Sequence, residues 1–357
     1  DRHGFRDRFE LIRSHLDKVL QITDKYGLQP MIWSDMYFRA ASPTHDYYDL
    51  AASIPEHVKQ ARPANVQLVY WDYYHNDPEF YSDYIERHRE FGLDPIFAGG
   101  IWVWGCWGPG YGKTFRTANA GLTACKEKGI REVFATLWGD DGTEVNYFTA
   151  LLGLQLYAEH SYSRDLDLEK LKRRVKFCTG VDYEAFMDLR YLDETPGTLP
   201  DNCEEMSSSN PSKYLLWQDV LLGLFDKHLA GENLEEHYAQ LREKLCRYKN
   251  QYPNGQLLFE TPEKLCAVLE QKSDLGLRMV RAYRKRDPAT LRNIAGQELS
   301  EIIQNVCDLR AAHRAEWFAI YKPFGWEVLD IRYGGLLSRL DSVIQRLNDS
   351  GRASRAY

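Results

Sequence analysis

Hydrophobic positions change period repeatedly along the first 160 residues. In the segment 6–26, Ile12, Leu16 and Leu20 recur at helical spacing among charged residues, and Gly27 follows as a stop signal. Comparable patterns predict helices over residues 46–61, 77–91, 114–128 and 144–159. Strand patterns lie between them, in "LQPMIWSDMYF", "NVQLVYWDYY", "DPIFAGGIWVW" and "REVFATLW". This alternation predicts parallel strands covered by helices, either in an open sheet or in a barrel.

Helical periodicity dominates the chain from about residue 163 onward. It runs through "DLEKLKRRVKFCTG", "SKYLLWQDVLLGLFDKHL", "NLEEHYAQLREKL" and the segment 291–321. A polar loop over residues 194–212 separates the first of these helices from the rest, and "KPFGWEVLDIRYGGL" interrupts the end with glycines and a proline. We therefore expect an α/β domain over residues 1–162 and an α-helical domain over residues 163–357.

Tryptophan and carboxylate side chains gather where the predicted strands end. In parallel α/β folds the carboxyl ends of the strands form the site, because the following loops converge there. One such end would favour a structural role, with tryptophan closing the core and aspartate capping a helix, but four together favour a shared pocket. The residues at the four ends are Trp33 and Asp35; Trp71, Asp72, Tyr73 and Tyr74; Trp102 and Trp104; and Trp138, Asp140, Asp141 and Glu144.

Aromatic faces beside carboxylates suit a carbohydrate. The C–H face of a sugar ring stacks on indoles, while its hydroxyl groups donate hydrogen bonds to carboxylates. The chain is 13% aromatic, with nine Trp and 23 Tyr. The chemistry of these residues therefore predicts a carbohydrate site.

Charge and composition exclude several other classes of protein. The formal net charge is −7, which argues against a general nucleic-acid-binding surface. No apolar run approaches the roughly 20 residues that cross a bilayer, and no segment resembles a secretory signal. Seven cysteines occur without a CxxC pair, as in a reduced compartment. We expect a bacterial cytoplasmic protein without nucleic-acid or membrane partners.

Other catalytic motifs give weak signals. "GGIWVWGCWGPGYG" lacks the order of a phosphate-binding loop, and its tryptophans would obstruct close approach of phosphates to the backbone. No HExxH or GxSxG motif occurs, and the ten histidines are dispersed. Cys106 has no clear base partner for a nucleophile. We expect neither a metal nor a cofactor.

Five segments together resemble a known family. "MIWSDMYF", "YWDYY", "GGIWVWG", "LWGDDGTE" and "KPFGWEVLDIRYGGL", in this order, resemble the family 20 glycoside hydrolases. The closest likeness is to the bacterial exo-β-N-acetylhexosaminidases that carry a helical domain after a (β/α)8 barrel. The resemblance implies that residues 1–162 are the C-terminal half of a TIM barrel, strands five to eight, followed by an all-helical domain.

The resemblance also implies a reaction. Members of this family remove terminal β-linked N-acetylglucosamine or N-acetylgalactosamine with retention, and the 2-acetamido oxygen of the substrate acts as the nucleophile. An Asp–Glu pair at the end of their fourth strand supplies the general acid. "DRHGFRDRF" resembles the segment just downstream of that pair, so the chain is expected to begin after it and to lack the acid. Neither Asp1 nor Glu10 is assigned its role.

Individual roles follow from the same resemblance. Asp140 would accept hydrogen bonds from the outer hydroxyls of the sugar, or cap a helix beginning near Asp141. Either Tyr73 or Tyr74 would support the acetamido oxygen as charge develops. The walls of the sugar pocket would be Trp33, Trp71, Trp102, Trp104 and Trp138.

Four further residues have expected roles outside direct catalysis. Asp35 and Asp72 would bind hydroxyls or orient the missing pair. Glu144 is expected in the first turn of the next helix, near its positive end. Arg332 is expected to tie the helical domain to the barrel. The partner is a carbohydrate or glycoconjugate with a terminal N-acetylhexosamine, and a homodimer is a possible assembly.

Two other functions fit the same residues. A different barrel hydrolase could use Asp72 and Asp140 directly as acid and base or nucleophile, with their separation setting the stereochemical outcome. A carbohydrate-binding protein without turnover is the second alternative. Fold likeness by itself does not decide among them.

Overall fold

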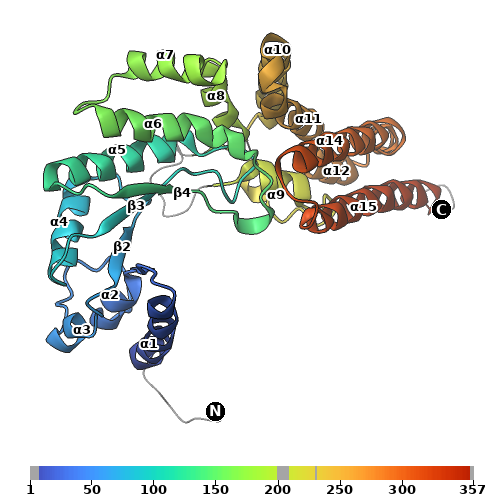
Figure 1. Ribbon diagram of the computed structural model, residues 1–357. Coiled ribbons are helices and arrows are strands. Elements are labelled where there is room, and N and C mark those ends of the chain that lie inside the picture. Colours follow the sequence, from blue (N-terminus) through green and yellow to red (C-terminus); the bar gives the residue numbers. More distant parts are fainter. Residues whose placement is uncertain (1–7, 199–208, 230, 354–357) are drawn as a thin grey trace. The chain divides into compact units, whose positions relative to one another are not determined.

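The computed structural model describes residues 8–198, 209–229 and 231–353 (Figure 1). Asp1 and most of "DRHGFRDRF" therefore lie outside the described residues. The chain divides into two compact units. The sheet unit comprises Asp1–Ile101, Thr114–Thr136 and His160–Asp165, and the helical unit comprises Trp102–Lys113, Leu137–Glu159 and Leu166–Tyr357.

A parallel four-stranded sheet organises the first unit. Its order is β1-β2-β3-β4, and every neighbouring pair is parallel. The strands are β1 (Met31–Trp33), β2 (Gln67–Trp71), β3 (Ile96–Gly100) and β4 (Val133–Thr136). The predicted parallel α/β arrangement is confirmed. All four carboxyl ends therefore lie along one edge of the sheet.

Helices cover one face of this sheet. They are α1 (Arg8–Lys25), α2 (Asp35–Ala41), α3 (Glu56–Gln60), α4 (Pro78–Arg89) and α5 (Tyr111–Lys128). Leu68, Tyr70 and Phe97 point to this face and are fully buried. A Cβ atom on Gly121 of α5 would lie 2.6 Å from Cζ of Phe97. The absence of a side chain at position 121 thus lets α5 approach the sheet closely.

The opposite face of the sheet is concave and only partly covered. Cross-strand register places Trp33 beside Val69, and Trp71 beside Ala98 and then Phe134, all on this face. The rings of Trp33 and Phe134 lie 6.2 Å apart, although β1 and β4 are opposite edges of the sheet. In a flat sheet the two strands would be about 14 Å apart, so the sheet curls toward this face. Trp33 and Phe134 are each 37% exposed.

The second unit is helical. Its longest helices pack in pairs, α10 against α11, α11 against α14, and α14 against α15. The α-helices are α6 (Ala150–Tyr162), α7 (Leu168–Thr179), α8 (Tyr183–Asp188), α9 (Pro211–Trp217), α10 (Leu234–Gln251), α11 (Gln256–Lys272), α12 (Leu275–Arg284), α13 (Pro288–Asn293), α14 (Leu299–Ile320) and α15 (Trp326–Ala353). Short 3-10 or π turns are η1 (Asp140–Gly142), η2 (Tyr147–Thr149), η3 (Leu189–Leu192), η5 (Asp226–His228), η6 (Pro253–Gly255) and η7 (Ile294–Glu298). The predicted helical character of the C-terminal part is confirmed.

Two element predictions in the sheet unit are wrong. Residues 46–55 form turns instead of a helix, because the carboxylates of Asp46 and Asp49 accept hydrogen bonds from nearby backbone N–H groups. Only α3 remains of the helix expected over residues 46–61. The strand expected in "LQPMIWSDMYF" is also shorter, because α2 begins two residues after Trp33.

Two further predictions, both in the helical unit, are wrong. The helix expected from residue 144 begins at Ala150, after the turn η2. The expected interruption in "KPFGWEVLDIRYGGL" ends at Trp326, and α15 continues through Gly334 and Gly335. Burial of Leu329, Tyr333 and Leu336 against the rest of this unit outweighs the low helix propensity of the two glycines.

The compact units follow a different division from the predicted domains 1–162 and 163–357, which stay a prediction. Residues 102–113, after β3, and residues 137–159, after β4, group with the C-terminal helices. Loops that leave two of the strands thus belong to the helical unit. No helix in the described part of the chain is both long enough and apolar enough to span a bilayer.

Candidate functional site

The predicted site residues fall into both units, six in the sheet unit and four in the helical unit. In the sheet unit, Trp71 is the centre of the aromatic set. Its ring stacks on Tyr47 at 4.9 Å, and its carbonyl oxygen accepts a hydrogen bond of 3.0 Å from the Tyr48 hydroxyl. Trp33 is the more exposed indole on the concave face. The structure thus places Trp33 and Trp71 on one surface.

Asp72 is buried among hydrogen-bond donors. One carboxylate oxygen accepts from the Tyr70 hydroxyl at 2.9 Å and from Nδ1 of His75 at 2.7 Å. The other accepts the backbone N–H of Tyr74 at 3.0 Å, and the Tyr81 hydroxyl lies 3.4 Å away. These contacts occupy both oxygens. Asp72 therefore fixes the turn after β2, and its orienting role fits better than direct contact with a substrate.

The other polar candidates of this unit lie close to Asp72 or follow β1. Tyr73 is buried, and its ring lies 4.7 Å from that of Tyr74. Asp35 is the first residue of α2 and pairs with Arg39 at 3.2 Å. A carboxylate in the first turn is favoured by the positive end of the helix. Asp35 thus has a structural function in α2, whereas the assignment of Tyr73 or Tyr74 to the acetamido group stays a prediction.

A buried polar chain lies behind the end of β1. Nδ1 of His88 donates to the Tyr84 carbonyl at 2.7 Å, so Nε2 accepts from the Ser34 hydroxyl, also at 2.7 Å. Tyr47 completes the chain, with its hydroxyl 2.8 Å from that of Ser34. Burial lowers the pKa of His88 to about 3. His88 is therefore neutral and positions the residues from which the loop after β1 departs.

In the helical unit, the rings of Trp102 and Trp104 stack on each other. Their rings are 4.4 Å apart, and Nζ of Lys113 lies 4.4 Å from the centre of the Trp102 ring. Trp102 is 5% exposed and Trp104 is 7% exposed. Protein atoms therefore cover most of both rings, and the role of these tryptophans as pocket walls stays a prediction.

Trp138 and Asp140 lie in the loop that follows β4. The Trp138 carbonyl accepts a hydrogen bond from the Tyr147 hydroxyl at 3.0 Å, and Asp140 is exposed. The predicted capping role of Asp140 is wrong, because Asp140 lies inside the turn η1 and the next turn, η2, is capped by Asn146. The side chain of Asn146 accepts the N–H of Phe148. Asp140 is thus left with its carboxylate at the surface.

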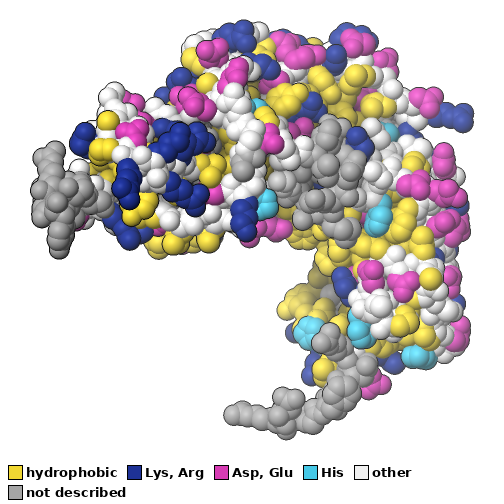
Figure 2. Space-filling model, turned by 180° about the vertical axis from the view of Figure 1, so that it is seen from behind, with side chains coloured by type: hydrophobic (Ala, Val, Ile, Leu, Met, Phe, Trp, Pro, Cys, Tyr) yellow, Lys and Arg dark blue, Asp and Glu magenta, His cyan; other side chains and the backbone are white. Residues whose placement is uncertain are grey.

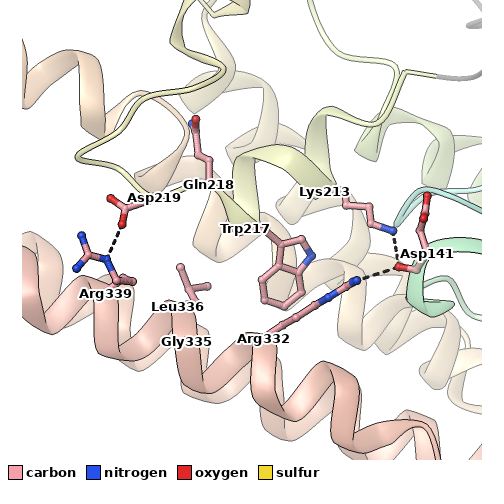
Figure 3. Close-up of a pocket in the computed structure, with 9 residues that line it drawn as sticks. All are labelled: Asp141, Lys213, Trp217, Gln218, Asp219, Arg332, Gly335, Leu336 and Arg339. Carbon is pink, nitrogen blue, oxygen red and sulfur yellow. Dashed lines mark hydrogen bonds and ion pairs between the residues drawn. The ribbon is translucent and has the colours of Figure 1, made fainter.

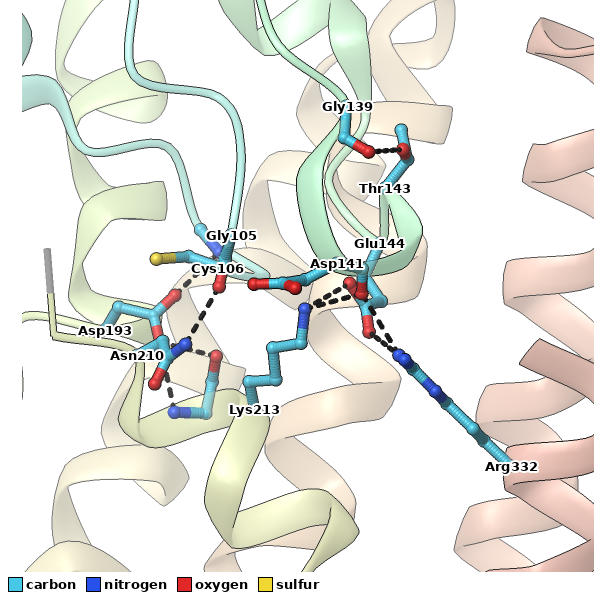
Figure 4. Close-up of polar contacts among 12 residues, drawn as sticks. Gly105, Cys106, Gly139, Asp141, Thr143, Glu144, Asp193, Asn210, Lys213 and Arg332 are labelled. Carbon is cyan, nitrogen blue, oxygen red and sulfur yellow. Dashed lines mark hydrogen bonds and ion pairs between the residues drawn. The ribbon is translucent and has the colours of Figure 1, made fainter. Parts of the chain in front are cut away.

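Glu144 holds this loop to the C-terminal helices (Figure 4). Its buried carboxylate accepts from Nζ of Lys213 and from the Arg332 guanidinium, each at 3.0 Å. Both cations also donate to the carbonyl oxygen of Asp141. The predicted position of Glu144 in a helical first turn is wrong, since it precedes η2. Arg332 ties α15 to the segment after the last strand, and both belong to the helical unit, so its expected contact with the barrel stays a prediction.

The same loop has an unusual backbone. Asp141 and Thr143 have φ values of 60° and 56°, and Gly142 lies between them at 111°. Left-handed conformations cost non-glycine residues free energy, so they persist where surrounding contacts hold them. Lys213, Arg332 and Glu144 supply those contacts. The sequence signal that could have revealed this loop was Gly139 and Gly142, which flank the two aspartates.

Asp193 fixes the loop after β3. Its carboxylate accepts the N–H of Gly108 at 2.8 Å and the hydroxyl of Ser212 at 2.6 Å. Asn210 adds a bond to the Gly105 carbonyl. Burial raises the pKa of Asp193 to about 6. The segment that carries the predicted residues Trp102 and Trp104 is thus anchored by residues about 100 positions later.

The described residues give no support to a cysteine nucleophile or to metal binding. Burial raises the pKa of the Cys106 thiol well above its usual range, so this thiol is held in the unreactive protonated form. Within the described segments, no group of three or more His, Cys, Asp or Glu is arranged to hold a metal ion.

Comparison with protein families identifies the helical C-terminal part. Residues 184–352 match the family model of the Glycoside Hydrolase 20C C-terminal domain. Residues 184–352 thus match the C-terminal part of a family 20 glycoside hydrolase. This match confirms the resemblance inferred from the motifs, and the family 20 domain spans α8 to α15.

Two other comparisons add less. A comparison with proteins of curated function gave no match. Among solved structures, the chain is similar to a GH138 enzyme targeting pectin rhamnogalacturonan II, with 10% identity and a TM-score of 0.40. That similarity covers 91% of this chain but only 58% of the other.

Proposed function

We propose that this chain is the C-terminal portion of an exo-β-N-acetylhexosaminidase. The enzyme would remove terminal β-linked N-acetylglucosamine or N-acetylgalactosamine by substrate-assisted, retaining hydrolysis. The observation that carries the proposal is the match of residues 184–352 to a family 20 domain, in a chain whose preceding part forms a parallel sheet with tryptophans at its strand ends.

The shape of the sheet supports its assignment as strands five to eight of a (β/α)8 barrel. Its outer face is covered by helices, as in a barrel wall. Its inner face carries apolar side chains that are partly exposed, among them Met31 (54%), Trp33 and Phe134. A second half-barrel would cover this face and pair with β1 and β4. It would also bring the Asp–Glu pair that supplies the general acid.

In this proposal the chain's own residues bind the sugar and stabilise charge. Trp33 and Trp71 on the inner face, and Trp138 after β4, would contact the sugar ring and the acetamido methyl group. The exposed carboxylate of Asp140 would accept hydrogen bonds from the outer hydroxyls. A tyrosine hydroxyl, from Tyr73 or Tyr74, would stabilise the acetamido oxygen as it attacks the anomeric carbon.

The contacts of Asp72 disfavour direct catalysis by Asp72 and Asp140. A general acid or nucleophile needs an oxygen that can reach the substrate. Both oxygens of Asp72 already accept hydrogen bonds from Tyr70, Tyr74 and His75. Asp72 thus has a positioning function in the proposed enzyme.

The test uses the product of the complete reading frame that contains this chain. We expect it to hydrolyse an aryl β-N-acetylglucosaminide and to leave the matching aryl β-glucoside intact, because the glucoside lacks the acetamido nucleophile. A thiazoline mimic of the cyclic intermediate should inhibit it. Equal cleavage of both substrates, or indifference to the thiazoline, would contradict substrate assistance.

A tryptophan variant tests the binding pocket within the same enzyme. Trp138→Ala should lower kcat/KM by about 100-fold, equivalent to about 2.7 kcal/mol of transition-state stabilisation. Trp317→Phe, in α14, is the control and should keep most of the activity. Unchanged kinetics of Trp138→Ala would remove this indole from the pocket.

A further inference from the structure

The helical unit contains a pocket lined mainly by residues of α9, the segment after it and α15, together with Asp141 from the loop after β4. It has a volume of about 480 Å³ and lies between the end of α9 and one face of α15 (Figure 3). Pockets of this size accommodate small organic ligands. Its lining includes Lys213, Trp217, Asp219, Arg332, Gly335 and Arg339.

Position 335 keeps the floor of this pocket open. Arg332, Gly335, Leu336 and Arg339 line it at spacings of three and four, which is one face of a helix. Glycine in a helix interior costs about 1 kcal/mol relative to alanine. A Cβ atom at Gly335 would meet no atom within 4 Å, so packing gives no reason for glycine. Close approach of a ligand to the backbone would give a reason for glycine at position 335.

An indole forms the apolar wall. Trp217 is half-buried, and its ring contacts that of Tyr333 at 5.1 Å. Figure 3 shows the indole between Leu336 and the Arg332 side chain. The ring nitrogen is enclosed and has no hydrogen-bond partner in the protein. The pocket thus has a fixed aromatic surface.

The charges around the indole are balanced. Arg339 pairs with Asp219 at 2.5 Å, while Lys213 and Arg332 share the carboxylate of Glu144. The carboxylate of Asp141 points away from both cations, which bond its carbonyl oxygen instead (Figure 3). Donors and acceptors therefore surround the cavity without a dominant sign of charge. This favours a neutral ligand rich in hydroxyl groups.

We propose that this pocket binds a neutral saccharide unit. One face of the sugar would stack on Trp217 above Gly335, its hydroxyls would accept from Lys213 and Arg332, and they would donate to Asp219. The assignment goes beyond the proposed hydrolase function and does not depend on it. No bond is broken here, and the pocket would hold a sugar that does not react.

The experiment compares substitutions at two adjacent glycines in the product of the complete reading frame. Gly335→Ala and Gly335→Leu place side chains of increasing size in the pocket. Gly334→Leu is the matched control, since a Cβ atom there also meets nothing within 4 Å and residue 334 does not line the pocket. All three should fold, because each replaces a helical glycine. Thermal melting checks this directly.

Binding is measured by saturation-transfer NMR with galactose, glucose and glucuronate at millimolar concentrations. Galactose and glucose lack the acetamido group that the proposed active site binds, and none of the three has a glycosidic bond to cleave. We expect signals from neutral sugars that persist in Gly334→Leu, weaken in Gly335→Ala and fall at least tenfold in Gly335→Leu. Equal signals in all variants, no signal at all, or binding of glucuronate alone would overturn the proposal.

The two proposals fail separately. A product without hydrolase activity but with binding that depends on position 335 would contradict only the proposed reaction. A hydrolase whose sugar binding ignores position 335 would contradict only the pocket assignment.

Discussion

Glu144 shows how one buried charge can set the geometry of a loop. Its carboxylate is inaccessible to solvent, and its two cationic partners stand 69 and 188 residues later in the chain. Removing one member of a buried ion pair leaves the others desolvated and unpaired. Here it would also release the left-handed backbone of Asp141 and Thr143. Glu144 therefore stabilises the folded chain and also orients the exposed Asp140.

We expect Glu144→Ala to lower the free energy of unfolding by about 3 kcal/mol or more. Urea denaturation monitored by circular dichroism measures this value. Glu184→Ala is the control, because the Glu184 side chain is 63% exposed and pairs with Lys172 at the surface. Its change should stay below about 0.5 kcal/mol. Similar losses in both variants would argue against the buried ion-pair arrangement.

Sequence reasoning found residues of the candidate site that sit next to strands. Trp33, Trp71 and Asp72 were identifiable because a strand end is a local signal that the hydrophobic pattern displays. The partners of Glu144 and the contacts of Asp193 were not identifiable, since they come from segments distant in the chain. Trp217 lies in a helix whose apolar pattern gives no sign of a pocket.

At the scale of elements, substitution of two helical glycines should change stability in opposite directions. Gly121 in α5 faces Phe97 of β3 and Tyr81 of α4, whereas Gly334 in α15 faces open space. Gly121→Ala should lower the free energy of unfolding by about 1 kcal/mol or more, because overpacking exceeds the gain in helix propensity. Gly334→Ala should raise it by about 1 kcal/mol.

Chemical denaturation of the two variants side by side checks the sign of each change. A stabilising Gly121→Ala would mean that α5 does not approach the sheet as closely as the contact to Phe97 requires. A destabilising Gly334→Ala would mean that position 334 is not open.

The order of strands and helices could be predicted because the hydrophobic period changes sharply at each boundary. The exceptions have local causes. Aspartates 46 and 49 bind the backbone of their own turns, and this competes with the helix expected there. In α15, long-range burial of Tyr333 and Leu340 outweighs the glycine pair, and periodicity within one segment contains no information about such packing.

At the scale of the whole molecule, stability should depend on pH through Glu316. Burial raises its pKa in the folded state to about 8 from the usual 4.5. The folded protein therefore keeps this proton while the unfolded chain has released it. This contribution to stability is complete below pH 4.5 and is lost as the pH rises from 4.5 toward 8.

Glu316→Gln keeps the shape of the side chain without its charge. We expect the melting temperature of the unsubstituted protein to fall, relative to that of Glu316→Gln, as the pH rises from 5 to 8. Buried His88 and His313, whose pKa values are lowered to about 3, act in the opposite direction and reduce stability below pH 6.5 in both proteins. Parallel curves for the two proteins above pH 5 would contradict a buried, protonated Glu316.

Apolar side chains at the surface of the sheet unit predict that this chain aggregates when it is expressed alone. Hydrophobic side chains are visible on that surface in Figure 2. The exposed apolar side chains of this unit include Leu11, Ile12 and Ile22 of α1 and Met31, Trp33 and Phe134 of the sheet. Contiguous apolar patches promote association, and the two edge strands offer unpaired backbone groups.

We expect residues 1–357 expressed alone to bind an environment-sensitive apolar dye strongly and to elute as aggregates. The product of the complete reading frame should be monodisperse and bind little dye. A sharply melting monomer of residues 1–357 with weak dye binding would contradict the half-barrel assignment.

The open space at Gly334, next to the pocket in the chain, makes this position a natural attachment point for a reporter group. A cysteine there would place its Cβ atom more than 4 Å from any neighbouring atom, and residue 334 does not line the pocket. Selective labelling would require serine in place of Cys203 and of the exposed Cys178, Cys246 and Cys307. The emission of such a label would follow occupancy of the pocket continuously in solution, including with polysaccharides too large for magnetic resonance.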